Sequence, residues 1–125
     1  MNREWLKRHL DAAFLAASWS KDATKVGAVL TSGKAVLATA YNGPPAGVQD
    51  LPERFARPAK YLFCSHAEQN LVAFAAKHGL RTDGLHVTVT HHPCADCCRL
   101  LIAAGIRAVF VGPGSTSMPA ETFEA

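Results

Sequence analysis

The sequence predicts an α/β domain built around a mixed β-sheet. Three observations support this: an amphipathic helical pattern at the N-terminus, two short apolar runs typical of a β-hairpin, and then helical patterns that alternate with strands. Hairpin strands are antiparallel, whereas strands joined by a crossover helix are parallel, so the sheet should contain both. A chain of 125 residues is long enough to bury one core, and we expect a single domain over 1–125.

The first half of the chain begins with a predicted helix over 3–19. Its apolar residues recur at intervals of three and four, the period of one helical face. Those residues are Leu6, Leu10, Ala13, Phe14 and Ala17. The apolar runs 26–30 and 35–38 then flank a glycine-containing turn, which predicts a hairpin. Residues 42–60, with an Asn-Gly pair, several prolines and several charges, indicate a long loop, and such loops are usually functional.

The second half should contain two helices and two strands. We expect a helix from about Ser65 to His78, with Ser65 as N-cap, Glu68 completing a capping box, and Gly79 ending it. Residues 85–90 alternate with β-branched side chains and predict a strand. A helix should then run from near Cys94 to Gly105, followed by a strand over 106–111.

Two short motifs at the starts of these helices carry metal-binding chemistry. The first is His66-Ala67-Glu68, and the second, 25 residues later, is Pro93-Cys94-Ala95-Asp96-Cys97. One histidine and two cysteines supply three zinc ligands, whereas a structural zinc site is usually closed by four. We therefore expect a catalytic zinc with one position open for water. Glu68 would be close enough to take a proton from that water.

The same residues also have simpler interpretations than a zinc site. Cys94 and Cys97 form a C-x-x-C pair, which also occurs in redox proteins, but that reading leaves His66 and Glu68 unexplained. His66 and Glu68 could each be ordinary residues of a helix start, where the dipole favours acidic side chains. Their coincidence with the cysteine pair favours the zinc site.

The placement of the motifs predicts how the ligands meet. Both motifs open helices that follow extended segments, so the two helices packed side by side would bring His66 to the cysteines. A spacing of three residues puts the two sulfur atoms on one helical face. We expect the helix dipole and backbone N–H groups at this end to favour thiolate over thiol at Cys94 and Cys97.

Composition and charge limit the functional class. The formal net charge of +3 suits an anionic small substrate, and the basic residues are too scattered to predict nucleic-acid binding. No apolar run approaches the roughly 20 residues that span a bilayer, and the N-terminus lacks a signal-sequence pattern. Four cysteines in such a chain indicate a reducing compartment, so we expect a cytoplasmic protein without membrane partners.

Beyond the metal motifs, the chain resembles the deoxycytidylate (dCMP) deaminase branch of the cytidine deaminase superfamily. The zinc nucleobase deaminases carry H-x-E followed by P-C-x-x-C. Four blocks of this sequence resemble the branch, over roughly residues 18–111. They are Ser20–Ala28 (S-K-D-P-x-x-x-V-G-A), Tyr41–Gly47 (Y-N-G-x-P-x-G), Lys60–Asn70 (K-Y, then H-A-E-x-N) and Pro93–Ile106 (P-C-x-x-C, ending in A-G-I). Ala23 replaces the usual proline. Branch members usually continue into a further helix and strand, so we expect either a minimal C-terminus here or a shortened chain.

The resemblance implies a fold, an activity and a set of residue roles. The fold would be a three-layer α/β/α sandwich with a mixed central sheet. The activity would be zinc-dependent hydrolytic deamination of dCMP to dUMP, with zinc on His66, Cys94 and Cys97 and Glu68 as the catalytic proton carrier. The backbone of Ala67 would read the base edge, and Asn42 would hydrogen-bond the sugar or phosphate, although an Asn-Gly turn alone also explains it.

Further expectations concern the phosphate, regulation and assembly. A monophosphate needs cationic donors, and Lys21 or Lys25 could supply one, although both are equally consistent with solvated charges. The branch implies possible allosteric control by dCTP or dTTP. The 49% apolar composition and the run at 100–104 predict a homo-oligomer, a hexamer or at least a dimer.

Two alternatives to dCMP deamination remain open. One is another superfamily enzyme that acts on cytidine, guanine or a tRNA adenosine, although the blocks at 20–28 and 41–47 favour dCMP. The other is a zinc-stabilised interaction module, which would not need Glu68.

The remaining histidines and cysteines near these motifs have simpler interpretations. His91 and His92 are adjacent in an extended segment and should point to opposite faces, so we do not expect both to join the metal site. Cys64 and Cys98 are expected to be small buried hydrophobic residues.

Overall fold

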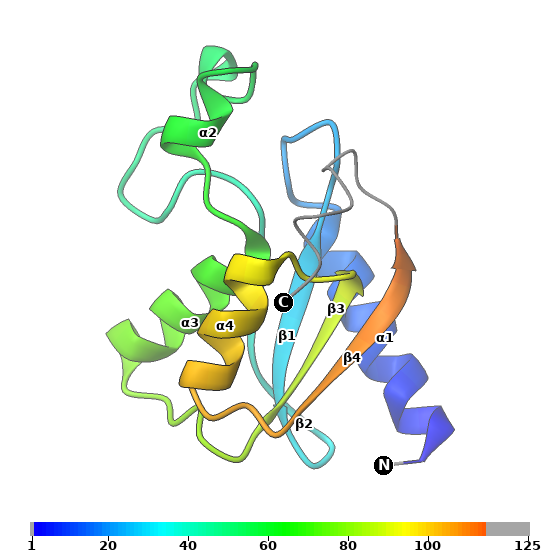
Figure 1. Cartoon of the computed structure of the whole chain (residues 1–125). Helices are drawn as coiled ribbons and strands as arrows, with labels where there is room; N and C mark the ends of the chain where they lie inside the picture. Colours follow the sequence, from blue (N-terminus) through cyan, green and yellow to red (C-terminus); the bar gives the residue numbers. More distant parts are fainter. Residues whose placement is uncertain (1, 115–125) are drawn as a thin grey trace.

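The computed structural model describes residues 2–114. Its elements follow the predicted order of helix, hairpin, helix, strand, helix and strand (Figure 1). They are α1 (Arg3–Ala17), β1 (Gly27–Ser32), β2 (Ala35–Tyr41), the 3-10 helix η1 (Pro52–Arg54), α2 (Lys60–Phe63), α3 (Ala67–His78), β3 (His86–His91), α4 (Ala95–Ala103) and β4 (Ala108–Gly114).

The four strands form one mixed sheet in the order β2-β1-β3-β4. β1 pairs antiparallel with β2 and with β3, whereas β3 and β4 are parallel and are connected through α4. The predicted hairpin is confirmed, with Gly33 at a φ of 57° in its turn, a left-handed conformation that favours glycine. The mixed sheet predicted from the alternation of elements is therefore present.

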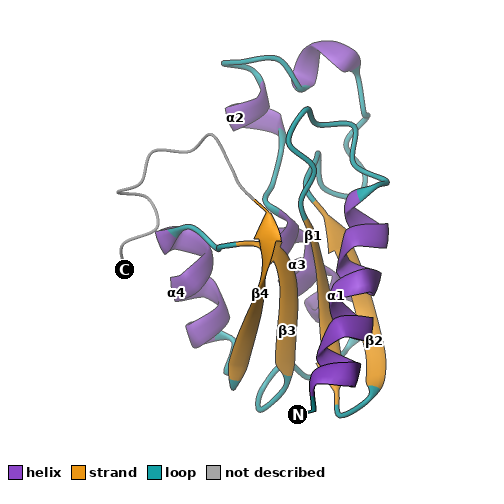
Figure 2. Cartoon of the chain, turned by 90° about the vertical axis from the view of Figure 1, so that its right-hand side faces the viewer, coloured by secondary structure: helices purple, strands orange, loops and turns teal. Residues whose placement is uncertain are grey.

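Helices cover both faces of the sheet. α1 lies against one face, and α3 and α4 lie against the other, as the view turned by 90° shows (Figure 2). The main core fills the space between the sheet and α3 and α4, where Leu30, Leu71, Val87 and Leu101 are each at most 1% exposed. This arrangement confirms the three-layer α/β/α fold.

The α1 layer packs unusually close to the sheet at the start of β1. A Cβ atom on Gly27 would lie 2.0 Å from the carbonyl oxygen of Ala13 and 2.6 Å from the backbone nitrogen of Ala17. One expectation for this helix is corrected. Phe14 is 41% exposed, and the buried set instead includes His9, at 2% exposure, whose Nε2 lies 3.0 Å from the carbonyl oxygen of Lys34.

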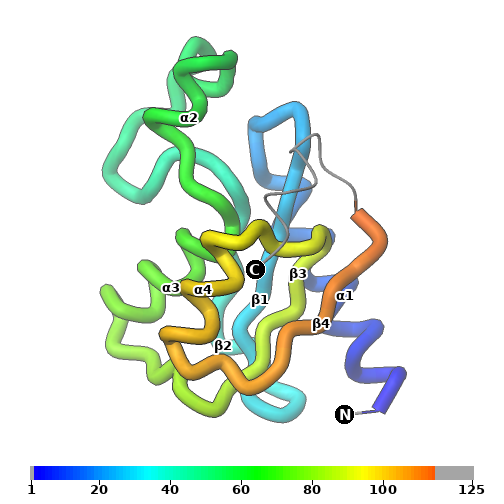
Figure 3. The backbone as a smooth tube through the Cα atoms, viewed as in Figure 1, coloured from blue at the N-terminus to red at the C-terminus, as the bar shows by residue number. Residues whose placement is uncertain are grey.

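Residues 42–63 project beyond the end of the sheet (Figure 3). The sequence predicted an irregular loop over 42–60, but this segment contains η1, and α2 begins at Lys60. Its backbone joins the body of the fold through an isolated bridge, in which Gly43 and Ser65 exchange two N–H···O=C bonds of 3.0 and 2.8 Å. The chain then runs from α2 down to the start of α3.

The end of the chain lies outside these observations. Ser115–Ser117 and the question of a fifth strand fall beyond the described residues. Within the described part, none of the helices is both long enough and apolar enough to cross a membrane.

Candidate active site

Two helix starts position the metal-binding side chains. The N-cap of α3 is His66, in an extended conformation (φ −70°, ψ 157°), and its backbone N–H donates to Gln69 Oε1 at 2.8 Å. The expected cap was one residue earlier, at Ser65 with Glu68, so the capping interaction is shifted by one position. The predicted end at Gly79 is confirmed by its φ of 70°.

The second helix start has the same form. Cys94 is the N-cap of α4 (φ −71°, ψ 171°), and Cys97 lies in the first turn of the helix. α3 and α4 pack against each other, so their two N-termini meet at one end of the sheet. The prediction that two adjacent helix starts would assemble the site is confirmed in this respect.

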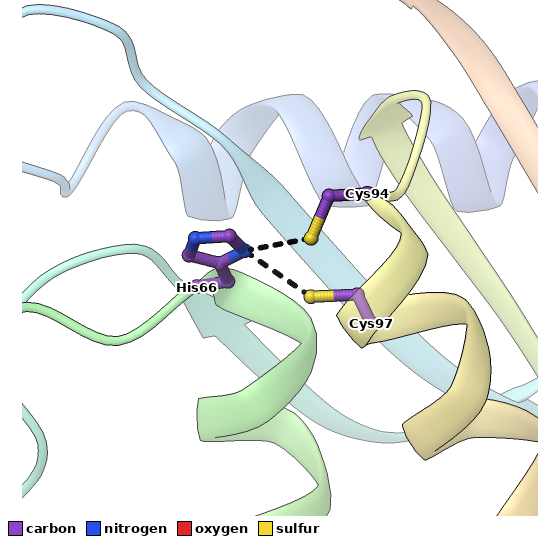
Figure 4. Close-up of side chains that lie close together, drawn as sticks. All are labelled: His66, Cys94 and Cys97. Atoms are coloured by element: carbon purple, nitrogen blue, oxygen red, sulfur yellow. Dashed lines mark hydrogen bonds between the residues drawn. The ribbon is translucent and has the colours of Figure 1, made fainter. Parts of the chain in front are cut away.

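The three side chains converge on a space that fits a metal ion (Figure 4). His66 Nδ1 lies 3.2 Å from Cys97 Sγ and 3.4 Å from Cys94 Sγ, and the three ligand atoms lie within 4.8 Å of one another. Zinc bonds of ~2.05 Å to nitrogen and ~2.3 Å to sulfur with tetrahedral angles place N and S about 3.6 Å apart. Two soft thiolates and one imidazole are also the donors that zinc prefers.

Glu68 lies beside this group. Its side chain hydrogen-bonds with Cys97, and the residue is only 4% exposed. Burial raises the pKa of Glu68 above its ordinary value, although hydrogen bonds from its own backbone and from Cys97 partly oppose this rise. A carboxyl group with a raised pKa that lies next to a metal-binding group is suited to accept and return a proton.

The protonation of the ligands follows from the same burial. Burial lowers the pKa of His66, so its imidazole is the neutral, metal-binding form at neutral pH. Burial, followed by the charges of Glu68 and Cys94, raises the pKa of Cys97 well above the ordinary range. At Cys97 desolvation therefore opposes the thiolate that the helix start was expected to favour. A metal ion must displace the thiol proton when it binds.

A cavity opens onto the metal-binding group and contains several of the predicted residues. Ala67 and Asn42 line it together with His66, Glu68 and Cys94. Asn42 also joins two segments, because its Oδ1 accepts from the Val26 N–H at 2.9 Å and its Nδ2 donates to the Thr24 carbonyl at 2.8 Å. Asn42 therefore helps to hold the cavity wall in place, in addition to its position in the Asn-Gly turn.

Lys21 and Lys25 are not among the residues that line this cavity. Lys21 Nζ lies 3.6 Å from Asp50 Oδ2, with its side chain 62% exposed, and it lines a different cavity. Lys25 Nζ donates to the Ser20 carbonyl. The structure thus does not bring either predicted phosphate contact to the metal-binding group.

Of four further residues, the two histidines stay outside the metal-binding group as expected, whereas the two cysteines differ from expectation. His91 and His92 both line the cavity, although neither belongs to the three-ligand group. Their nitrogens contact near neighbours: His91 Nδ1 lies 2.6 Å from Thr90 Oγ1, and His92 Nδ1 lies 2.8 Å from the Pro93 carbonyl oxygen. Cys64 and Cys98 are only half-buried, and Cys64 contributes to the cavity wall.

Sequence reasoning missed two cationic residues of the cavity, Arg57 and Lys60. Both lie within residues 42–60, which were interpreted as a loop, and a loop has no periodic pattern from which the direction of a side chain can be predicted. The resemblance of Lys60-Tyr61 to the K-Y block was the feature in the sequence that pointed to this position.

Comparisons with known proteins agree with this geometry. Residues 3–113 match the model of the cytidine and deoxycytidylate deaminase zinc-binding region. An uncharacterised deaminase from the luxG 3′ region of Aliivibrio fischeri is 40% identical over 111 residues, covering 88% of this chain and 74% of that protein. Human deoxycytidylate deaminase is 35% identical over 114 residues, covering 85% of this chain and 63% of that protein.

A solved structure shows the same fold. The dCMP deaminase of cyanophage S-TIM5 superposes with a TM-score of 0.76 at 31% identity, covering 89% of this chain and 84% of that one. The family model describes a zinc-binding region, and the His66, Cys94 and Cys97 group fits that metal. By its sequence, its fold and this metal-binding group, the chain belongs to the cytidine and deoxycytidylate deaminase family.

Proposed function

We propose that this protein is a zinc-dependent enzyme that hydrolyses dCMP to dUMP and ammonia. The observation that carries the proposal is Glu68, a buried carboxyl group next to a three-ligand metal group at one cavity. A purely structural zinc site does not require such a carboxylate. The cyanophage relative, which has also been solved in complex with dCMP and dUMP, supports this choice of substrate.

Each of these residues would have a distinct role in the reaction. His66, Cys94 and Cys97 would hold zinc, which supplies Lewis-acid chemistry and makes water available as a nucleophile at neutral pH. Glu68 would take a proton from the water, pass one to N3 of the cytosine ring and return one to the departing amine. The C4–N bond breaks and a C4–O bond forms, so water and the amino group are exchanged for a carbonyl oxygen and ammonia.

The cavity wall would orient the nucleotide. Ala67, at the first position of α3, lines the cavity, and its backbone is proposed to contact the base edge. Asn42 is proposed to contact the sugar, while its other hydrogen bonds keep the 24–26 segment in place. These contacts would hold C4 of the base next to the metal and Glu68.

A substrate panel tests this proposal. Purified, zinc-loaded protein is assayed for ammonia release from dCMP, deoxycytidine, cytidine, CMP, dCTP, guanine and an adenosine-containing tRNA anticodon stem. We expect dCMP to give the highest kcat/KM. Comparable kcat/KM values for dCMP and deoxycytidine would contradict the assignment of dCMP as substrate. Ammonia release from guanine or tRNA alone would favour the other branches of the superfamily.

We also propose that the enzyme acts in the cytoplasm as a homo-oligomer, a hexamer or at least a dimer. Apolar side chains at the surface support association, above all Leu62 at 83% and Ile102 at 74% exposure. Control by dCTP or dTTP is a further part of this proposal, to be tested by adding each nucleotide to the dCMP assay.

A further inference from the structure

The active-site cavity contains its own cationic side chains. Among the described residues that line it, the lysine and the arginine are Lys60 and Arg57. A phosphate monoester is recognised by such charges or by N–H groups, and a site without them gains little from binding an anion. The cations of this cavity are therefore the groups to consider for the phosphate of a nucleotide.

Lys60 is held in a defined position. Its Nζ lies 3.1 Å from Asp22 Oδ2 and 3.2 Å from Asp22 Oδ1, and its side chain is 19% exposed. An ammonium group has three N–H donors. Contacts to the two oxygens of one carboxylate use at most two of them, so at least one donor is left for a ligand in the cavity.

Asp22 is itself fixed within the fold. Its side chain is 3% exposed, and its Oδ1 accepts from the Thr24 backbone N–H at 3.0 Å. Its own N–H donates to Ser20 Oγ at 3.1 Å, and that hydroxyl donates to the Asn42 carbonyl at 2.8 Å. The carboxylate that holds Lys60 therefore belongs to a hydrogen-bonded turn that forms one wall of the cavity.

We infer that Lys60 binds the 5′-phosphate of the substrate and is a specificity-determining residue for nucleotide over nucleoside. The inference rests on the proposed function, since it assigns a role within that site. Arg57 lies in the same wall, three residues earlier, with its guanidinium 5.8 Å from the Tyr61 ring centre, and adds a second positive charge. Asp22 is a positioning residue, because it acts through Lys60. The alternative is that the Lys60–Asp22 pair only ties the 57–64 segment to the 20–26 turn.

The test compares ligands that differ only in the phosphate. Affinities of zinc-loaded wild-type protein and the Lys60→Met variant are measured by calorimetry for dUMP and for deoxyuridine, and kcat/KM is measured for dCMP and deoxycytidine. Loss of one charge-assisted hydrogen bond should weaken dUMP binding about 10- to 100-fold. Deoxyuridine binding and deoxycytidine turnover should be unchanged, and Lys60→Arg should recover most of the dUMP affinity.

Two further variants sharpen the result. Lys7→Met removes an exposed lysine on α1 and should change neither affinity, whereas Lys25→Met tests the competing cation predicted from the sequence. If Lys60→Met weakened the binding of dUMP and deoxyuridine equally, Lys60 would only link the two segments, and the inference would be overturned. A larger loss of dUMP affinity in Lys25→Met than in Lys60→Met would also overturn it. If wild-type protein released no ammonia from dCMP, the proposed function would fail, while the dUMP comparison would still decide the role of Lys60.

Discussion

Glutamate is usually exposed to solvent, but Glu68 is not. It is almost fully buried, and its side chain hydrogen-bonds with a metal-binding thiol, Cys97. Burial raises the pKa of the carboxyl group, so the residue exchanges protons more readily near neutral pH than an exposed glutamate does. The same burial also disfavours the folded state once the group is ionised. One residue is therefore expected to affect catalysis and stability in opposite directions.

The catalytic effect is tested by Glu68→Gln. The amide keeps the size of the side chain but cannot take up a proton, so we expect kcat for dCMP to fall by about 10²–10⁴-fold. Zinc content, measured by metal analysis, should remain that of the wild type, because the three ligands are untouched. A variant that lost both zinc and activity would instead place Glu68 among the ligands.

The effect on stability is tested on chelated protein across a pH series. Because the folded-state pKa of Glu68 is raised, its contribution to stability is present below the unfolded-state value of ~4.3 and is lost as pH rises through the folded-state value. At pH 7, Glu68→Gln should therefore have a higher Tm than wild type, and the difference should shrink toward pH 4. The exposed residue Glu53 provides the control, since Glu53→Gln should show no such pH-dependent gain. An equal Tm difference at both pH values would contradict this account.

At the scale of elements, α1 and β1 pack closely together at Gly27, directly after the 20–26 turn that lines the active site. Gly27 begins β1, and its N–H donates to Thr90 Oγ1 at 3.1 Å on the neighbouring strand. The space that a side chain would need is filled by backbone atoms of α1, which cannot rotate away. The element pair is therefore sensitive to a single added methyl group.

Gly27→Ala should lower the free energy of unfolding by about 1–3 kcal/mol, because overpacking forces backbone shifts. Urea titration followed by circular dichroism measures the change. Val36→Ala, which truncates a side chain that is 43% exposed on β2, serves as the control and should stay within about 0.5 kcal/mol of wild type. Unchanged stability of Gly27→Ala would mean that α1 moves without cost.

Much of the element order could be read from the sequence, since periodicity and glycine stops reflect local physics. The apolar alternation of β3 and the stop at Gly79 are examples. The buried residues of α1 were predicted less well, because His9 is buried and Phe14 is exposed. Which side of the helix is buried depends on how α1 packs against β1, and the sequence alone does not show this. The metal ligands were predicted because their residue types are specific. Lys60 was not, since its proposed role depends on its contact with Asp22, which lies 38 residues away in sequence.

At the scale of the whole molecule, apolar surface is unevenly distributed. Leu62 and Tyr61 project from α2, at 83% and 63% exposure, and Ile102 projects from α4. Val109 and Val111 on β4 are also exposed, at 37% and 44%. Exposed apolar groups of this size commonly mark interfaces between subunits.

We therefore expect the protein to have a mass in solution at least twice the 13.3 kDa of one chain. Light scattering coupled to size-exclusion chromatography at micromolar concentration measures this, alongside dCMP turnover of the same fractions. A monomer with full activity would be the contrary result.

The metal ligands also have a consequence for the chain as a polymer. His66 and Cys94 lie roughly 28 residues apart in sequence, and an ion bound to both closes a loop as a disulfide does. If the ion also stays bound to the unfolded chain, the loop lowers the entropy of that chain by an amount equivalent to about 3–4 kcal/mol. In the folded state the ion joins the first turns of two neighbouring helices, so binding energy becomes folding energy. Adding a chelator should lower Tm, and hydrogen exchange should increase first at the starts of α3 and α4, before the β1–β2 hairpin, which lies outside the closed loop. The ion proposed to activate water would then also act as a cross-link, so removing it should abolish activity and lower the stability of the fold at the same metal concentration.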